Sequence, residues 1–171
     1  FRRVLFRSTN GIYETEKSTN PCLLASVILS PSYLSFDWAL SYYGLIPEKV
    51  ISITSATFGN RKNKTFENYF GRYEYTDIPA EAFPEGLTYL DKDKYMVKIA
   101  TKEKALCDSL CKWRVVKNVN ELKELLFEDK RIDEDEFAIC DFKLMKRLSS
   151  LYRKTNLKFL IKLIKKEYEN E

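Results

Sequence analysis

Residues 32–57 read SYLSFDWALSYYGLIPEKVISITSAT, and this stretch predicts a capped helix, a tight stop and a short strand. Ser35 suits the cap position at the start of the helix, because a short hydroxyl side chain can accept a hydrogen bond from a free backbone N–H. Gly44 can adopt the left-handed conformation that ends a helix, and Pro47 prevents the helix from resuming. The β-branched residues within 50–54 favour a strand. Because the helix is rich in aromatic residues, we expect it to be buried on most sides.

The rest of the chain predicts a group of short strands between helices. This order indicates an α+β fold in a single domain, with a small mixed or antiparallel sheet flanked by helices and a helical C-terminal third. The expected elements are a helix over 21–29 capped by Asn20, strands over 65–76 (one, or two separated at Gly71), 87–90 and 95–100, helices capped by Thr101 and Asn120, a helix within 133–141, and a helical tail over 143–166 with a break near 155–156.

The first residues need separate treatment. Residues 3–8 read RVLFRS, which is the translation of the end of a common sequencing adapter. We therefore expect residues 1–10 to be a non-native or disordered start, and residues 11–171 to form the folded domain. The alternative is a native basic amphipathic start.

The composition argues against several kinds of chemistry. The 171-residue chain contains no histidine, which removes the usual general base and the Ser-His and Cys-His nucleophile pairs. Cys107 and Cys111 lie one turn apart on a predicted helix, but without histidine or a second close cysteine pair they do not form a zinc motif. Buried free thiols are the expected alternative. No apolar run reaches membrane-spanning length and no secretory signal is visible, so we expect a cytoplasmic protein without membrane contact. From the missing histidine and zinc motif we also expect no cofactor, metal or catalytic site.

Carboxylates and basic residues leave two alternative functions open. A restriction-nuclease-like metal site could use Asp91 with Asp93, or Glu121 with Lys123. However, the first pair lies in a predicted turn and Glu121 lies on a predicted helix, so surface charges are favoured. The second alternative is a general nucleic-acid-binding module, which could use a basic turn beside aromatic residues; a solvated hairpin turn is favoured over it. The turn residues are Arg61, Lys62 and Lys64, which are also candidate partner-binding residues.

Charge is distributed unevenly in the C-terminal third. Residues 121–141 contain nine acidic and three basic residues, whereas residues 143–166 contain nine basic residues and no acidic one. The tail could therefore bind nucleic acid or an acidic partner, or it could be a solvated helix partly neutralised by the acidic segment. In a helical tail, an apolar stripe would dock on the domain and leave cations exposed. The stripe consists of Leu157, Leu160, Ile161 and Ile164, and the candidate partner-binding residues are Arg153, Lys154, Lys158, Lys162 and Lys165.

Two blocks of sequence carry a resemblance to a known protein family. They are residues 33–35 (YLS), 39–48 (ALSYYGLIPE) and 53–57 (ITSAT) in the first block, and 99–108 (IATKEKALCD) in the second. In this order and spacing they resemble the abortive-infection antitoxin family (AbiEi-like) of bacterial type IV toxin–antitoxin systems, whose second block reads ATPEKALLD. Lys102 stands in place of the family's proline, and Cys107 in place of a leucine. With the region between the blocks, the resemblance covers about residues 11–114.

The resemblance implies a non-enzymatic function. Members of this family are encoded beside a nucleotidyltransferase-like toxin, which they counteract during phage defence, and full-length members also repress their own operon. They bind operator DNA through an N-terminal winged helix, of which only residues 11–14 resemble a part here. Residues 11–171 would then be an antitoxin C-terminal-type domain. Its expected partner is the cognate toxin or the nucleic-acid substrate of that toxin, with operator DNA bound only through the missing domain.

Overall fold

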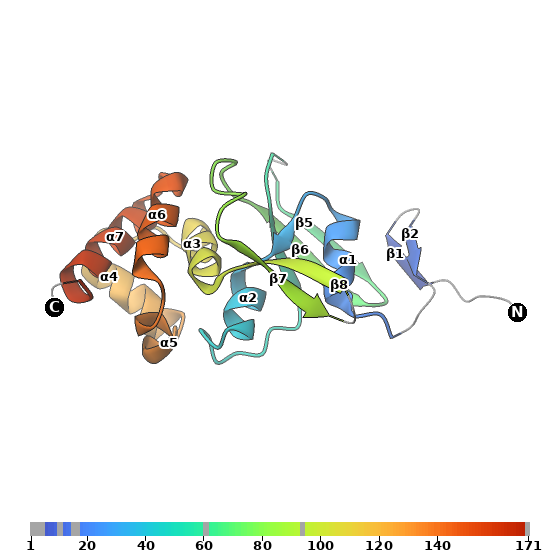
Figure 1. Ribbon diagram of the computed structural model, residues 1–171, viewed down its shortest axis with the longest axis horizontal. Coiled ribbons are helices and arrows are strands. Elements are labelled where there is room, and N and C mark those ends of the chain that lie inside the picture. The colour runs from blue at the N-terminus through green and yellow to red at the C-terminus, as the bar shows by residue number, and fades with distance from the viewer. Residues whose placement is uncertain (1–5, 10–11, 15–17, 60–61, 93–94, 170–171) are drawn as a thin grey trace, which may run out of the picture.

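The computed structural model describes residues 6–9, 12–14, 18–59, 62–92 and 95–169, and a six-stranded sheet lies at its centre (Figure 1). In sheet order the strands are β5 (Lys64–Asn68), β6 (Gly71–Asp77), β4 (Ile53–Thr57), β3 (Tyr33–Leu34), β8 (Tyr95–Ala100) and β7 (Leu87–Lys92). β4 pairs with β6 and β3 with β8 in parallel, and the other neighbours pair antiparallel, so the sheet is mixed.

The helices follow the order predicted from the sequence. They are α1 (Pro21–Ile28), α2 (Phe36–Tyr42), α3 (Lys102–Lys112), α4 (Val119–Lys123), the π-helix η1 (Glu124–Asp129), α5 (Glu134–Ala138), α6 (Phe142–Tyr152) and α7 (Thr155–Glu167). α4 to α7 gather at one end of the molecule, and α3 lies between them and the sheet (Figure 1). The α+β class with a helical C-terminal part is therefore confirmed. Among the described residues, no helix combines the length and apolar character that crossing a bilayer requires.

The stretch that predicts the fold forms α2 and β4. Gly44 has a φ of 75°, and the N–H of Leu45 returns to the carbonyl of Leu40 at 2.9 Å, so the helix stops as expected. The predicted strand start was wrong by three residues, because β4 begins only at Ile53, where it meets its partner Tyr73 on β6. Ile51, which precedes this pairing, is 87% exposed.

Two of the three other predicted helix caps are confirmed. Asn20 and Thr101 cap α1 and α3 as predicted, and β5 and β6 are separate strands of a hairpin. The Asn120 cap was wrong, because Asn118 caps α4 by accepting a hydrogen bond from the N–H of Glu121 at 2.9 Å.

The break in the tail lies two residues earlier than predicted. Arg153, with a φ of 52°, follows the last residue of α6, and α7 begins at Thr155. The left-handed backbone at Arg153 reverses the chain, and Asn156 is already buried inside the second helix.

At the other end of the chain, Phe6–Thr9 forms β1, which pairs antiparallel with β2 (Ile12–Glu14); residues 1–5 and 10–11 lie outside the described residues.

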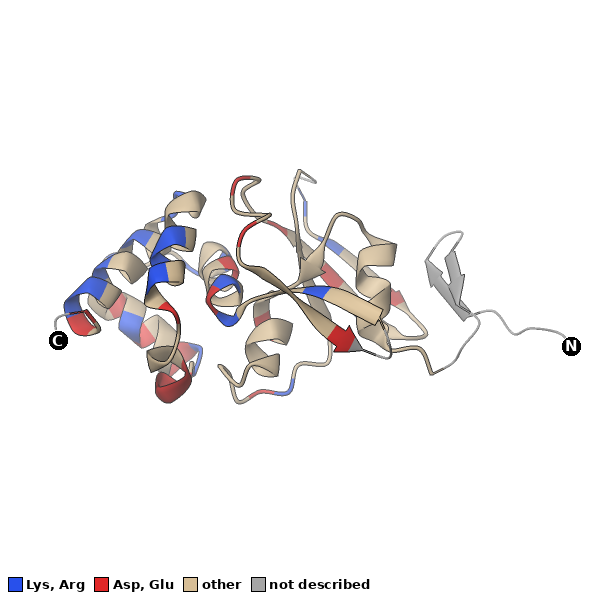
Figure 2. Cartoon of the chain, viewed as in Figure 1, with Lys and Arg blue, Asp and Glu red and all other residues tan. Residues whose placement is uncertain are grey.

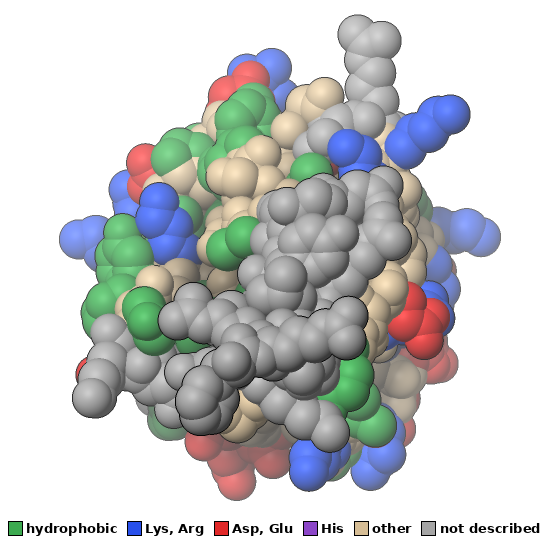
Figure 3. Space-filling view, turned by 90° about the vertical axis from the view of Figure 1, so that its right-hand side faces the viewer, with side chains coloured by type: hydrophobic (Ala, Val, Ile, Leu, Met, Phe, Trp, Pro, Cys, Tyr) green, Lys and Arg blue, Asp and Glu red, His purple; other side chains and the backbone are tan. Residues whose placement is uncertain are grey.

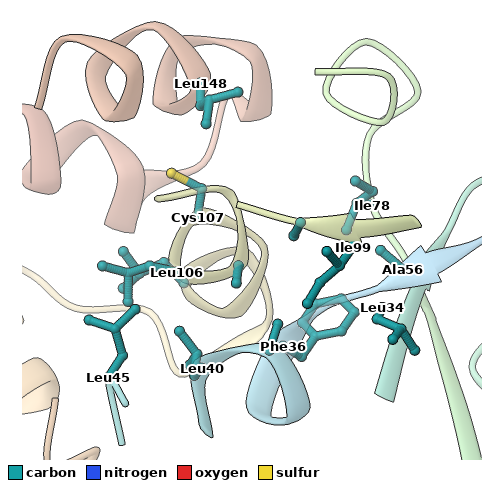
Figure 4. Close-up of a cluster of buried hydrophobic side chains, with 14 of the residues drawn as sticks. Leu34, Phe36, Leu40, Leu45, Ala56, Ile78, Ile99, Leu106, Cys107 and Leu148 are labelled. Atoms are coloured by element: carbon teal, nitrogen blue, oxygen red, sulfur yellow. The ribbon is translucent and has the colours of Figure 1, made fainter. Parts of the chain in front are cut away.

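The sheet, α2 and α3 share one apolar core. Ile99 on β8, Leu40 on α2 and Leu106 on α3 are each 0% exposed, and Figure 4 shows them in one layer of buried apolar side chains, with Ile99 near Phe36 and with Leu40 and Leu106 near Leu45. The aromatic helix α2 is buried on one side only, because Tyr42 is 47% exposed and stacks on Trp38 with ring centroids 5.7 Å apart. The expectation that this helix is buried on most sides was therefore only partly correct.

The buried thiols make stability sensitive to alkaline pH. Burial raises the pKa of the Cys107 thiol from its ordinary 9.0 to about 12, and that of Cys140 likewise to about 12. A raised folded-state pKa gives stability that is fully present below pH 9 and is lost as the pH rises through 12. We expect the free energy of unfolding to fall by about 1 kcal/mol per thiol between pH 9 and pH 10, as measured by urea denaturation. A Cys107→Ala/Cys140→Ala variant should lose the share of this fall that belongs to its two thiols, about 2 kcal/mol, while Cys111 and the buried tyrosines keep the rest, because burial raises their pKa values as well. An equal fall in that variant would contradict the assignment.

Candidate functional site

The second helix of the C-terminal pair, α7, and the residues just before it carry a row of exposed cations. We call this set the α7 basic surface, and it consists of Arg153, Lys154, Lys158, Lys162 and Lys165. All five side chains are exposed, and within the part of the chain that the structure describes none of them is in an ion pair. Lys162 lies over the ring of Phe159, with its Nζ 5.3 Å from the ring centroid. The predicted exposure of the five candidate residues is thus correct.

The opposite side of α7 is packed against the rest of the domain. Leu157, Leu160 and Ile164 of the predicted stripe are 0% exposed, whereas Ile161 is only partly buried and Leu163, at 0% exposed, belongs to the stripe as well. This burial fixes which side of the helix faces solvent. The lysines point outward because the apolar residues at helical spacing are all turned inward.

Asn156 anchors the start of α7, and sequence reasoning missed this role. Its Oδ1 accepts a hydrogen bond from the N–H of Val116 at 3.0 Å. Its Nδ2 donates to the carbonyls of Leu110 at 3.1 Å and Arg114 at 2.9 Å. The available signal was that residue 156 falls on the same helical face as 160, 163 and 164, so its side chain had to be buried and bonded.

The acidic segment does not neutralise the α7 basic surface. Its ion pairs run elsewhere: Asp129 pairs with Arg114 at 2.7 Å, and Glu136 with Lys102 at 3.5 Å. Figure 2 shows the separation, with Lys and Arg along α6 and α7 and Asp and Glu around α5. Two other cations of the tail are paired, since Lys146 contacts Glu169 and Arg147 lies 3.0 Å from Glu85, whereas Lys143 on α6 is exposed without an ion pair among the described residues. The unpaired cations are therefore concentrated on α7 and on the turn that precedes it.

The other candidates from the sequence do not join this surface. Lys62 is exposed and Lys64 lies on the edge strand β5, which is separate from α7 in Figure 1, while Arg61 lies outside the described residues.

The two carboxylate sites considered for a metal lie on different elements. Asp91 lies on β7 and not in the predicted turn, and its proposed partner Asp93 lies outside the described residues. Glu121 lies on α4, which is separate from β7 in Figure 1. Glu121 accepts a hydrogen bond from the N–H of Lys117 at 3.0 Å, and Lys123 pairs with Glu167 at 2.9 Å. Over the described ranges, no three Cys, Asp or Glu residues are placed to hold a metal ion.

A buried ion pair on α3 is the main polar feature that sequence reasoning missed. Lys104 and Asp108 lie one turn apart, their Nζ and Oδ1 atoms are 3.1 Å apart, and both side chains are 0% exposed. Lys104 also donates to the carbonyl of Ala82 at 2.7 Å and to the hydroxyl of Tyr152. All three protons of the ammonium group thus have acceptors, as a buried charge requires.

The Asp108 carboxylate completes the cluster. Its Oδ2 accepts hydrogen bonds from the Tyr33 hydroxyl at 3.0 Å and the Ser35 hydroxyl at 2.6 Å, and its Oδ1 accepts one from Tyr152. Burial, followed by the negative charge of Asp108, raises the pKa of Tyr33 well above its ordinary value, so this hydroxyl stays protonated. Ser35 therefore serves this cluster and makes no side-chain cap on α2, contrary to the prediction. We call Tyr33, Ser35, Lys104, Asp108 and Tyr152 the buried polar cluster, because none of these residues is more than 2% exposed.

The buried polar cluster joins two distant stretches of sequence. Tyr33 and Ser35 lie around β3, whereas Lys104 and Asp108 lie on α3. The same two stretches also meet in the sheet, where Leu34 pairs in parallel with Ile99, and through the Tyr43 hydroxyl, which donates to the carbonyl of Ala100 at 2.9 Å.

Comparison of the chain with protein-family models and with curated proteins finds no match.

Proposed function

We propose that this protein is the antitoxin of a bacterial type IV toxin–antitoxin system, which acts in the cytoplasm in phage defence by abortive infection. Its task is to counteract a nucleotidyltransferase-like toxin, without enzymatic activity of its own. A full-length form would also repress its operon through an N-terminal winged helix. The proposal rests on the resemblance of residues 33–57 and 99–108 to AbiEi-like antitoxins.

One observation gives this resemblance more weight than two separate short matches. Asp108 from the second block accepts hydrogen bonds from Tyr33 and Ser35 of the first block. Loss of Asp108 would leave the buried hydroxyls of Tyr33 and Ser35 without this acceptor, and a buried polar group left unpaired costs about 1–3 kcal/mol, so the first block depends on the second. Residues 33–57 and 99–108 therefore form one structural unit, and the resemblance extends over that unit as a whole.

Growth rescue tests the proposal. The chain should restore growth of bacteria that express the nucleotidyltransferase-like toxin encoded beside it, in proportion to the amount of soluble antitoxin present. The measurement is colony formation with the toxin alone, with toxin and chain, and with a catalytically dead toxin as the control. A soluble, cooperatively folded chain that gives no rescue would count against the antitoxin function.

A metal-dependent nuclease is the alternative that the same protein preparation can test. The purified chain, supplied with Mg²⁺ or Mn²⁺, should not degrade single- or double-stranded DNA or RNA, because no three Cys, Asp or Glu residues in the described ranges are placed to hold a metal ion. Turnover that is abolished by Asp91→Ala or Glu121→Ala would replace the antitoxin proposal with the nuclease.

A further inference from the structure

We propose that the α7 basic surface binds a nucleic acid through its phosphate backbone. The binding itself follows from the chemistry of this surface alone. Its identification with the nucleic-acid substrate of the toxin rests on the proposed function, and would mean that the antitoxin acts where the toxin acts.

The lysines of this surface form a straight row. Lys154, Lys158, Lys162 and Lys165 follow one another at intervals of four, four and three residues. At helical geometry they fall within about 80° of the circumference and extend over about 16 Å, with steps of about 6 Å. Such a row can follow a charged polymer over several repeating units.

The row carries an electrostatic cost that a polyanion would remove. Like charges four residues apart on a helix destabilise it by about 0.2–0.5 kcal/mol per pair, and Lys154, Lys158 and Lys162 form two such pairs. Lys154 also lies at the N-terminal end of α7, where the helix dipole is positive, and the first turn contains no acidic residue to offset it. The dipole of α7 favours an acidic residue at this position.

The chemistry of the surface fits a nucleic acid better than a protein. Protein interfaces are depleted in lysine and enriched in aromatic residues, methionine and arginine. Among the described residues, no large exposed hydrophobic side chain lies on α6 or α7. Exposed ones lie on other elements, among them Val27 on α1, Tyr89 on β7 and Met96 on β8, and Figure 3 shows hydrophobic side chains reaching the surface at the end of the molecule that carries α1.

A membrane surface fits less well for a different reason. An interfacial amphipathic helix inserts its apolar side into the bilayer. In α7 that side is already used, since Leu157, Leu160, Leu163 and Ile164 are 0% exposed inside the domain. Only the cationic side is available to a partner.

Lysine side chains contact phosphates as point charges and do not read bases. We therefore expect binding with little sequence preference and a steep dependence on salt. Neutralising four or five phosphates gives a slope of log K against log salt of about −3 to −4.

The experiment is a fluorescence anisotropy titration of the purified chain against labelled single-stranded RNA, single-stranded DNA and duplex DNA over a series of NaCl concentrations. The test variant is Lys158→Glu/Lys162→Glu/Lys165→Glu. We expect it to bind at least about 10-fold more weakly at low salt, and its salt slope to be shallower by about 2–3. The three probes show which form of nucleic acid the surface prefers.

The matched control is Lys49→Glu/Lys98→Glu/Lys117→Glu, which makes the same change in net charge at exposed lysines outside α7. It should bind almost as the unchanged chain does, and thermal unfolding should show that both variants remain folded. Three results would overturn the proposal: no binding by the unchanged chain at low salt, an equal loss in both variants, or tighter binding of polyglutamate than of RNA and DNA, which would indicate an acidic protein partner. Failure of growth rescue with retained nucleic-acid binding would count against the antitoxin function alone.

Discussion

Replacing Lys104 with methionine is expected to lower the free energy of unfolding by about 3–5 kcal/mol, because it leaves the Asp108 carboxylate buried without its cation. Methionine keeps most of the side-chain length, so the loss of packing stays small. The Tyr152 hydroxyl and the carbonyl of Ala82 lose their donor in the same variant. Urea denaturation at neutral pH measures the change through the transition midpoint.

The control for this prediction is Lys102→Met. Lys102 pairs with Glu136 at 3.5 Å with both side chains partly exposed, and an exposed pair contributes about 0–1 kcal/mol. Adding Asp108→Asn to Lys104→Met should cost less than the sum of the two single changes, since no lone charge then remains in the core. If Lys104→Met cost as little as Lys102→Met, water would have to reach the Asp108 carboxylate, and the cluster could not be closed.

Replacing Leu160 with aspartate is expected to cost about 4 kcal/mol or more, because it places a carboxyl group without a partner among buried apolar side chains. Leu160 is 0% exposed in the middle of α7. Burial raises the pKa of the introduced carboxyl in the folded state above its unfolded value, so the loss should be largest near neutral pH and smaller as the pH falls toward the unfolded pKa.

Urea denaturation at two pH values checks this expectation, with Lys158→Asp as the control. Lys158 is exposed two residues away, and a surface substitution there should change stability by less than about 0.5 kcal/mol. A similar small change for both variants would mean that α7 does not dock through its apolar stripe.

The elements that the sequence predicted well are those whose signals are local. The stop at Gly44 needs only a residue that tolerates a positive φ, and α7 needs only apolar residues at helical spacing. The start of β4 was misplaced because β-branched side chains indicate strand preference, whereas the strand begins where its pairing begins, at Ile53 opposite Tyr73 of β6. β3 contains only Tyr33 and Leu34, which is too short for any periodicity, and it exists because β4 and β8 lie on either side of it.

The α7 basic surface could be predicted from local sequence signals, whereas the buried polar cluster could not. Exposure of Lys158 follows from its place opposite the apolar stripe, so it could be predicted from the sequence alone. A lysine in the first turn of a helix is normally solvated, and nothing near Lys104 in the sequence indicates otherwise. Its burial depends on Ala82 and Tyr152, which are distant in the sequence and are brought to it only by the complete fold.

The position of Tyr152 has a consequence for how the domain comes apart. This residue is the last of α6, yet its hydroxyl contacts both charged groups on α3, while Tyr33 holds the same carboxylate from the sheet. Separation of the C-terminal helices from the sheet would take the Tyr152 hydroxyl away from both charged groups and expose the apolar side chains that now cover them, so neither half gains stability from opening alone. Sheet and helices consequently behave as one cooperative unit, and a truncation that removes α6 and α7 takes away part of what keeps the sheet folded.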